Sequence, residues 1–177
     1  MPVWIWNWPR RVPTGRIALV VSAFLSVWRQ SKAMEMLTMG KVTVSARIEN
    51  LADLIRSQAG DISSDVVRAI DLDNALVDTG ATMLSLPSKH IRALGLQRHR
   101  TRTARTTAGL ISFGVYEPVR LTVQERDCVV EVCEIPDDCP TLIGQIPLEA
   151  LDFVVDPNGQ KLLGNPEHGG QHMIDLF

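Results

Sequence analysis

Ala75-Leu76-Val77-Asp78-Thr79-Gly80-Ala81-Thr82 is the stretch that decides the fold of this chain. Three apolar residues lead into an Asp-Thr-Gly turn, and the apolar run Met83-Leu84-Ser85-Leu86-Pro87 follows it. The residues before the turn fit a buried strand, and Gly80 lets the backbone turn sharply and approach a second backbone closely. The pattern therefore predicts that a strand holds Asp78 at the base of a cleft.

The Asp-Thr-Gly triplet occurs once in the 177 residues. Two adjacent carboxylates cannot both ionise, so they share a proton, and such a pair can activate water for attack on an amide carbonyl. One triplet supplies one carboxylate, so the second would have to come from another copy of the chain. The competing interpretation is an ordinary turn, because all three residue types occur readily in turns.

A second apolar element ending in glycine, Leu142-Ile143-Gly144, lies about sixty residues after the triplet. Between the two, the pattern is that of strands joined by short turns, with turns expected at Ala108-Gly109 and Glu125-Arg126-Asp127. The strands expected here are 101–107, 111–116, 119–124 and 128–132. This succession of hairpins favours a small antiparallel barrel or sandwich.

Alternation and capping signals predict the remaining elements. Asn50 is expected to cap a helix over 51–58, and Gly95 to end a helix over 87–94. A helical turn is expected over 147–151. Further strands are expected at 41–48, 66–70, 72–77, 141–144, 153–155 and 160–163.

The Val77-Asp78-Thr79-Gly80-Ala81 motif, the hairpin region and Leu142-Ile143-Gly144 together resemble a retropepsin-type (retroviral-like) aspartic protease over about residues 41–163. The resemblance implies a mostly β fold: a closed acid-protease barrel with one or two short helices, assembled as a homodimer. It implies an aspartic endopeptidase that acts on peptides or proteins without a metal or organic cofactor.

Carried onto this sequence, the resemblance makes Asp78, Thr79 and Gly80 the catalytic turn, with Ala81 beside the substrate. It also implies a flap, a hairpin that closes over the substrate, for which the segment 106–111 is the candidate. The substrate-binding residues expected there are Thr107, Ala108, Gly109 and Leu110. Two features depart from the family pattern, namely the helix at 51–58 and the length of chain after the last strand.

Two alternatives of other classes stay open. The first is a non-catalytic module of the same fold that dimerises or binds peptides, since fold does not fix function. The second is a scaffold barrel in which Asp78 only caps a turn. Inhibition by a statine-type peptide separates them, because such a transition-state mimic needs a working pair of carboxylates.

Composition limits the partners and the compartment. Lys and Arg total 18 against 20 for Asp and Glu, so the net charge does not indicate binding to nucleic acid. The basic cluster at 98–105 is expected to be a solvated strand edge, because no aromatic residues interleave with it. Three cysteines without pairing or metal spacing favour reduced thiols and a cytoplasmic protein.

The chain divides into a protease-like domain at 39–164 and two tails, 1–38 and 165–177. Residues 17–28 are largely apolar and follow a basic start, so export or membrane anchoring through this segment is the alternative to a cytoplasmic location. His168 and His172 have a spacing found in metal sites. Gly169 and Gly170 between them disfavour the helix that would align them, so a flexible tail without a metal is expected.

Overall fold

The computed structural model describes residues 41–106 and 109–174. The expected N-terminal segment, including residues 17–28, lies outside the described residues. No helix within the described ranges is long and apolar enough to cross a membrane.

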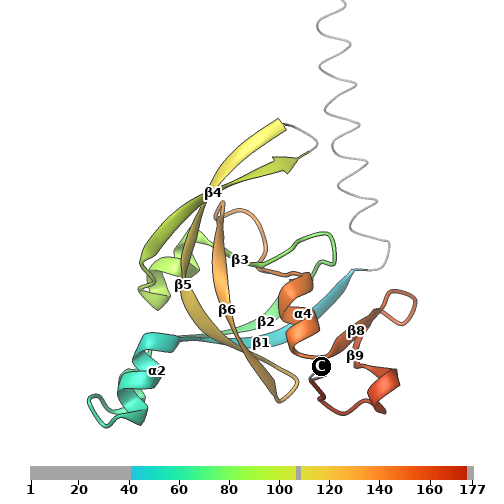
Figure 1. Cartoon of the computed structure of the whole chain (residues 1–177), viewed down its shortest axis with the longest axis horizontal. Coiled ribbons are helices and arrows are strands. Elements are labelled where there is room, and N and C mark those ends of the chain that lie inside the picture. The colour runs from blue at the N-terminus through green and yellow to red at the C-terminus, as the bar shows by residue number, and fades with distance from the viewer. Residues whose placement is uncertain (1–40, 107–108, 175–177) are drawn as a thin grey trace, which may run out of the picture. The chain divides into compact units, whose positions relative to one another are not determined.

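A seven-stranded mixed sheet forms most of the fold (Figure 1). Its order is β1-β2-β7-β3-β6-β5-β4, and β1 pairs with β5 as well as with β2. The strands are β1 (Val42–Asn50), β2 (Ala69–Val77), β3 (Leu84–Pro87), β4 (Arg98–Thr106), β5 (Gly109–Val123), β6 (Arg126–Ile135) and β7 (Leu142–Ile143). A separate two-stranded sheet contains β8 (Phe153–Asp156) and β9 (Lys161–Gly164).

The expectation of a mostly β fold is confirmed, whereas the expected antiparallel closed barrel is wrong in detail. The sheet is mixed and is not a clean barrel, since β2 pairs with β7 and β3 pairs with β6 in parallel. Strand β7 supplies one of these two parallel pairings, because it enters between β2 and β3 and separates these sequence neighbours. Such long-range pairing leaves no local pattern in the sequence.

Three short helices occur in the described residues where one or two were expected: α2 (Leu51–Gln58), α3 (Ser88–Leu94) and α4 (Gln145–Ala150). The expected caps are present. Asn50 Oδ1 accepts a hydrogen bond from Asp53 N at 3.1 Å, and Gly95 ends α3 with a φ of 63°. Short 3-10 turns lie at Ser64–Val66 and Pro166–His168.

Some strand boundaries differ from those expected. The two strands expected at 66–70 and 72–77 are the single strand β2, and β5 runs continuously to Val123 with an irregularity after Tyr116. The turn before β6 is at Gln124 and Glu125, whose φ angles are 47° and 69°, rather than at 125–127. Arg126 belongs to β6, where its guanidinium lies 4.5 Å from the centre of the Phe153 ring.

The apolar side chains of β1, β2, β3, β5 and β6 meet in one core, which α3 and α4 also enter. Its fully buried members include Ile48, Leu84, Leu121, Val132 and Ile143. Ile143 comes from the two-residue strand β7, so the element that separates β2 from β3 is also anchored in the core. Burial of that side chain stabilises the fold by roughly 1.5–3 kcal/mol.

Candidate functional site

Asp78 stands directly after β2, at the point where the strand becomes a turn. Its carboxylate Oδ1 accepts a hydrogen bond from Gly80 N at 2.9 Å, and its carbonyl oxygen accepts one from Ala81 N at 3.1 Å. The Asp78 side chain is half-buried, and Thr79 and Gly80 are exposed. The sequence thus brings its three expected catalytic residues into one tight turn at the surface.

Strand β7 clamps this turn from one side. Leu76 and Val77 lie beside Leu142 and Ile143 in a parallel pairing. The amide of Asp78 then donates to Ile143 O at 3.0 Å, which extends the ladder to the aspartate itself. The backbone of Asp78 is therefore fixed by a segment 65 residues further along the chain.

The start of α4 holds the far side of the same turn. Gln145 N donates to Ala81 O at 2.8 Å, and Ile146 N donates to Thr82 O at 3.0 Å. These amides belong to the first turn of a helix, where N–H groups have no partner within the helix itself. The two ends of the Asp78 turn are thus hydrogen-bonded to β7 and α4.

Gly144 makes this clamp possible because it joins β7 to α4 in direct contact with the turn. A Cβ atom at this position would lie 2.6 Å from Met83 O and 2.7 Å from Ala81 O. Both are backbone atoms, which cannot move aside cheaply. The glycine in Leu142-Ile143-Gly144 is therefore required by close approach of two backbones rather than by a positive φ.

The segment expected to be the flap lies in the β4–β5 hairpin, where Arg98–Thr106 pairs with Gly109–Tyr116. Thr107 and Ala108 lie outside the described residues. Gly109 is the first residue of β5, and the side chain of Leu110 is 71% exposed. Ala81, the other expected substrate contact, lies in the Asp78 turn and is half-buried. A hairpin at this place agrees with the expectation, while its closure over a substrate stays a prediction.

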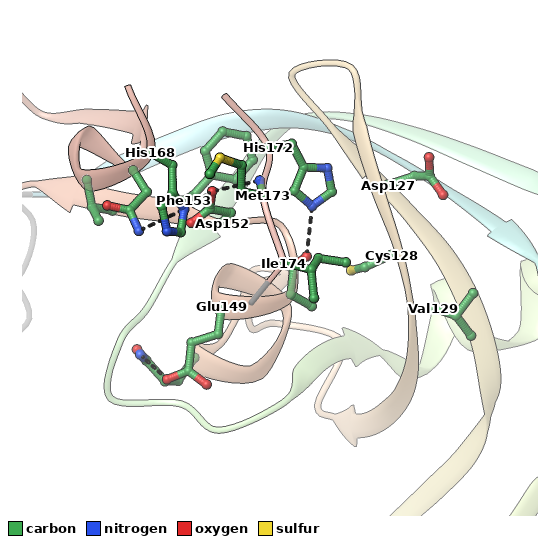
Figure 2. A pocket seen from close by; sticks show the side chains of 14 residues that line it. Asp127, Cys128, Val129, Glu149, Asp152, Phe153, His168, His172, Met173 and Ile174 are labelled. Atoms are coloured by element: carbon green, nitrogen blue, oxygen red, sulfur yellow. Dashed lines mark hydrogen bonds and ion pairs between the residues drawn. The ribbon is translucent and has the colours of Figure 1, made fainter. Parts of the chain in front are cut away.

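A pocket of about 750 Å³ lies elsewhere, between α4, β6, β8 and the C-terminal segment (Figure 2). Its polar groups bind one another. His168 Nδ1 lies 2.7 Å from Asp152 Oδ2, which also accepts a hydrogen bond from Met173 N, and His172 Nε2 lies 3.1 Å from Ala150 O. Residues 165–174 therefore pack against the domain, where the sequence predicted a flexible tail.

The Asp152 carboxylate in this pocket is bound by side chains and backbone of the C-terminal segment. The hydrogen bond from His168 holds the pKa of Asp152 at about 2, well below its usual value. The described residues contain no group of three or more His, Cys, Asp and Glu side chains placed to hold a metal. Asp78 is not among the residues that line the pocket. The hollow is therefore separate from the Asp78 turn.

The thiols of Cys128 and Cys133 are poor nucleophiles. Burial raises the pKa of Cys128 to about 11, and burial also raises the pKa of Cys133. Because the thiolate is the reactive form, neither cysteine is activated for attack.

Sequence reasoning missed the face of the sheet that adjoins the turn. Ser85 and Cys133, which pair between β3 and β6, lie on this face with Arg102. Arg102 is exposed on the edge strand β4, as expected for the basic cluster at 98–105. The two-residue spacing of Arg100 and Arg102 was the available signal, because alternate residues of a regular strand point to one face. Arg98 lies before an irregularity in β4 and pairs with Tyr116.

Comparisons with known proteins leave the function of this site open. No protein-family model matches the chain, and no curated protein is significantly similar to it.

Proposed function

We propose that this protein is an aspartic endopeptidase whose active site forms between two copies of the chain, each of which contributes Asp78. The observation that carries the proposal is the double clamp on the Asp78 turn by β7 and α4. An ordinary surface turn needs no such fixation. A reacting carboxylate does, because a displacement of about 1 Å can cost a hundredfold in rate.

The hydrogen bonding of the carboxylate supports the same conclusion. Oδ1 accepts from Gly80 N, and no other hydrogen bond to this side chain is present within the described ranges. Oδ2 is therefore available to a water molecule or to a second carboxylate. The exposed Thr79 and Gly80 leave room for another chain to approach this end of the molecule.

The proposed reaction follows from pairing two such carboxylates. Two negative charges in close contact repel, so the pair holds one proton. The ionised Asp78 accepts a proton from a water molecule as the water oxygen attacks the peptide carbonyl. The protonated Asp78 of the second copy donates a hydrogen bond to the carbonyl oxygen, on which negative charge develops. A proton delivered to the amide nitrogen then allows the C–N bond to break.

The test is hydrolysis of a denatured protein by the full chain, with and without a statine-type peptide. The proposal expects cleavage that this inhibitor blocks, with one inhibitor bound per two chains in a calorimetric titration. Binding without any cleavage would support the peptide-binding module instead. Cleavage that the inhibitor leaves unchanged would contradict the shared pair of carboxylates.

A further inference from the structure

Exposed apolar side chains gather around α4. More than half of the large apolar side chains that are exposed in the described residues line two hollows beside this helix. They are Val129, Ile146, Val154, Met173 and Ile174. Single apolar residues on a surface are ordinary, whereas a contiguous group of them marks a surface that binds a partner or a ligand. The surroundings of α4 are therefore a candidate docking surface.

The two hollows adjoin at Val129, which lines both of them. The smaller hollow has a volume of about 190 Å³ and is mostly apolar, and the larger one is the pocket of about 750 Å³ described above. Together they are here named the α4 groove, whose walls include Ile146 and Glu149 on α4 and Asp127 and Val129 on β6. Figure 2 shows Ile174 between these two elements. The groove is thus open to solvent and bounded by side chains of both elements.

The α4 groove carries negative charge that the chain itself does not neutralise. Asp127 and Glu149 are exposed, and neither forms an ion pair within the described part of the chain. Glu131 and Asp152, the other carboxylates of the two hollows, already have partners. Among the described residues, no lysine or arginine lines either hollow. The neighbouring Arg126 instead donates to backbone carbonyls. A cationic partner therefore complements this groove.

We infer that the α4 groove docks an extended segment of a partner protein in which an apolar residue is flanked by lysine or arginine. Apolar cavities of roughly 150 Å³ accommodate a benzene ring, so the smaller hollow has room for one side chain of the size of leucine or phenylalanine. Val129 and Asp127 are two residues apart on β6, a distance of roughly 7 Å. A long cationic side chain next to the apolar residue spans that distance. The inference goes beyond the proposed function, because docking requires no bond to be cleaved.

The experiment measures the binding of fluorescein-labelled peptides by fluorescence anisotropy. The probe is Gly-Ser-Lys-Leu-Lys-Ser-Gly, and two control peptides replace its leucine by serine or both lysines by glutamate. The full chain carries Asp78→Asn, so that cleavage cannot remove the probe. Ile146→Gln is compared with Ile55→Gln, since both isoleucines lie on helices and are 48% and 57% exposed. Glu149→Gln is compared with Glu125→Gln, because Glu125 is exposed and lines neither hollow. Circular dichroism verifies that every chain is folded.

Ile146→Gln should weaken binding of the probe about tenfold, through lost apolar contact, and Glu149→Gln about threefold, the strength of an exposed ion pair. Salt at about 0.5 M should remove most of the second effect and little of the first. Both control variants should bind like the parent chain, and both control peptides should bind at least about threefold more weakly than the probe. Equal binding of the three peptides, or equal binding by Ile146→Gln and Ile55→Gln, would overturn the inference.

Sedimentation velocity on the same chains tests the other occupant, a second copy of this chain. Ile146→Gln should leave the dimer fraction unchanged if the groove docks a partner segment. A dimer that is lost in Ile146→Gln and retained in Ile55→Gln would make this face an interface between copies and would also overturn the inference. Hydrolysis by the wild-type chain is measured separately, so none of these results decides the proposed function.

Discussion

The molecule contains two aspartate turns that look alike locally and differ in what surrounds them. Asp78 Oδ1 accepts from Gly80 N at 2.9 Å, and Asp156 Oδ1 accepts from Asn158 N and Gly159 N at 3.0 Å each. Both side chains are half-buried. The Asp156 turn simply joins β8 to β9, whereas the Asp78 turn is fixed by backbone hydrogen bonds from β7 and α4.

The Asp156 turn only reverses the chain, whereas the position of the Asp78 turn is fixed by contacts with distant parts of the chain. A carboxylate that accepts hydrogen bonds from following amides is a common local motif. Long-range hydrogen bonds to both ends of the turn are not part of that motif. The surroundings, rather than the Asp-x-Gly pattern, therefore distinguish a candidate reacting group from a structural one.

Replacing each aspartate tests the comparison most directly. Asp78→Asn should reduce hydrolysis by at least about 10³-fold, because asparagine cannot act as a base or share the proton. Asp156→Asn should stay within about twofold of wild type, because its amide oxygen still accepts from the turn. The measurement is kcat/KM on one peptide, with melting curves for both variants. Equal activities in the two variants would erase the distinction between the turns.

Dilution tests whether the Asp78 turn is only half of a site. Specific activity should fall in parallel with the dimer fraction, because the monomer has one carboxylate. Mixing wild type with a ninefold excess of Asp78→Asn should lower the activity per wild-type chain about tenfold by random pairing. Sedimentation velocity on the same samples measures the dimer. Constant specific activity in monomeric samples would contradict the shared pair.

A pair of glycine variants tests the clamp. A Cβ at Gly144 would meet backbone atoms of the Asp78 turn at 2.6–2.8 Å, so Gly144→Ala should reduce the free energy of unfolding by roughly 1–3 kcal/mol. A Cβ at Gly159 would meet the end of the Asp156 side chain, at 2.4 Å from Oδ2. Because that carboxylate can rotate away, Gly159→Ala should cost less than about 0.5 kcal/mol. Urea unfolding compares the two. An equal loss of unfolding free energy in the two variants would show that β7 and α4 do not pack tightly against the Asp78 turn.

The smallest expected effect concerns a third aspartate, Asp152, whose role is structural. His168 and the amide of Met173 bind its carboxylate, and its pKa is about 2 in the folded chain. A carboxyl with a lowered pKa stabilises the fold above its unfolded pKa, near 4, and loses that contribution as the pH falls through 2. Wild type should therefore be more stable than Asp152→Asn at pH 5, and the difference should shrink by pH 2.

The readout for Asp152 is the urea midpoint of both chains at pH 5, 4, 3 and 2. Hydrolysis by Asp152→Asn at pH 5 should match wild type while the chain is folded, in contrast to Asp78→Asn. A stability difference that does not change with pH would mean that the carboxylate is not bound in the way described. Lost activity in folded Asp152→Asn would link the C-terminal pocket to the proposed site.

The sequence by itself determined the local features. The Asp78 turn, the Asn50 cap and the end of α3 at Gly95 follow from the preferences of single residues and their neighbours, so all three could be predicted. The glycine of Leu142-Ile143-Gly144 was also visible in the sequence, although the close approach of two backbones that requires it was not. Short-range preferences act within a few residues, and the sequence displays them directly.

Tertiary structure alone decided which distant elements meet. The insertion of β7 between β2 and β3 adds a parallel pairing to the sheet, and it unites Asp78 with Ile143. The parallel pairing of β3 with β6 aligns Ser85 with Cys133, which are 48 residues apart in the chain. Two apolar residues can pair with many strands, and only burial of Ile143 in the common core selects this partner. The physical reason is that strand pairing depends on packing across the whole sheet, which no single window of the sequence contains.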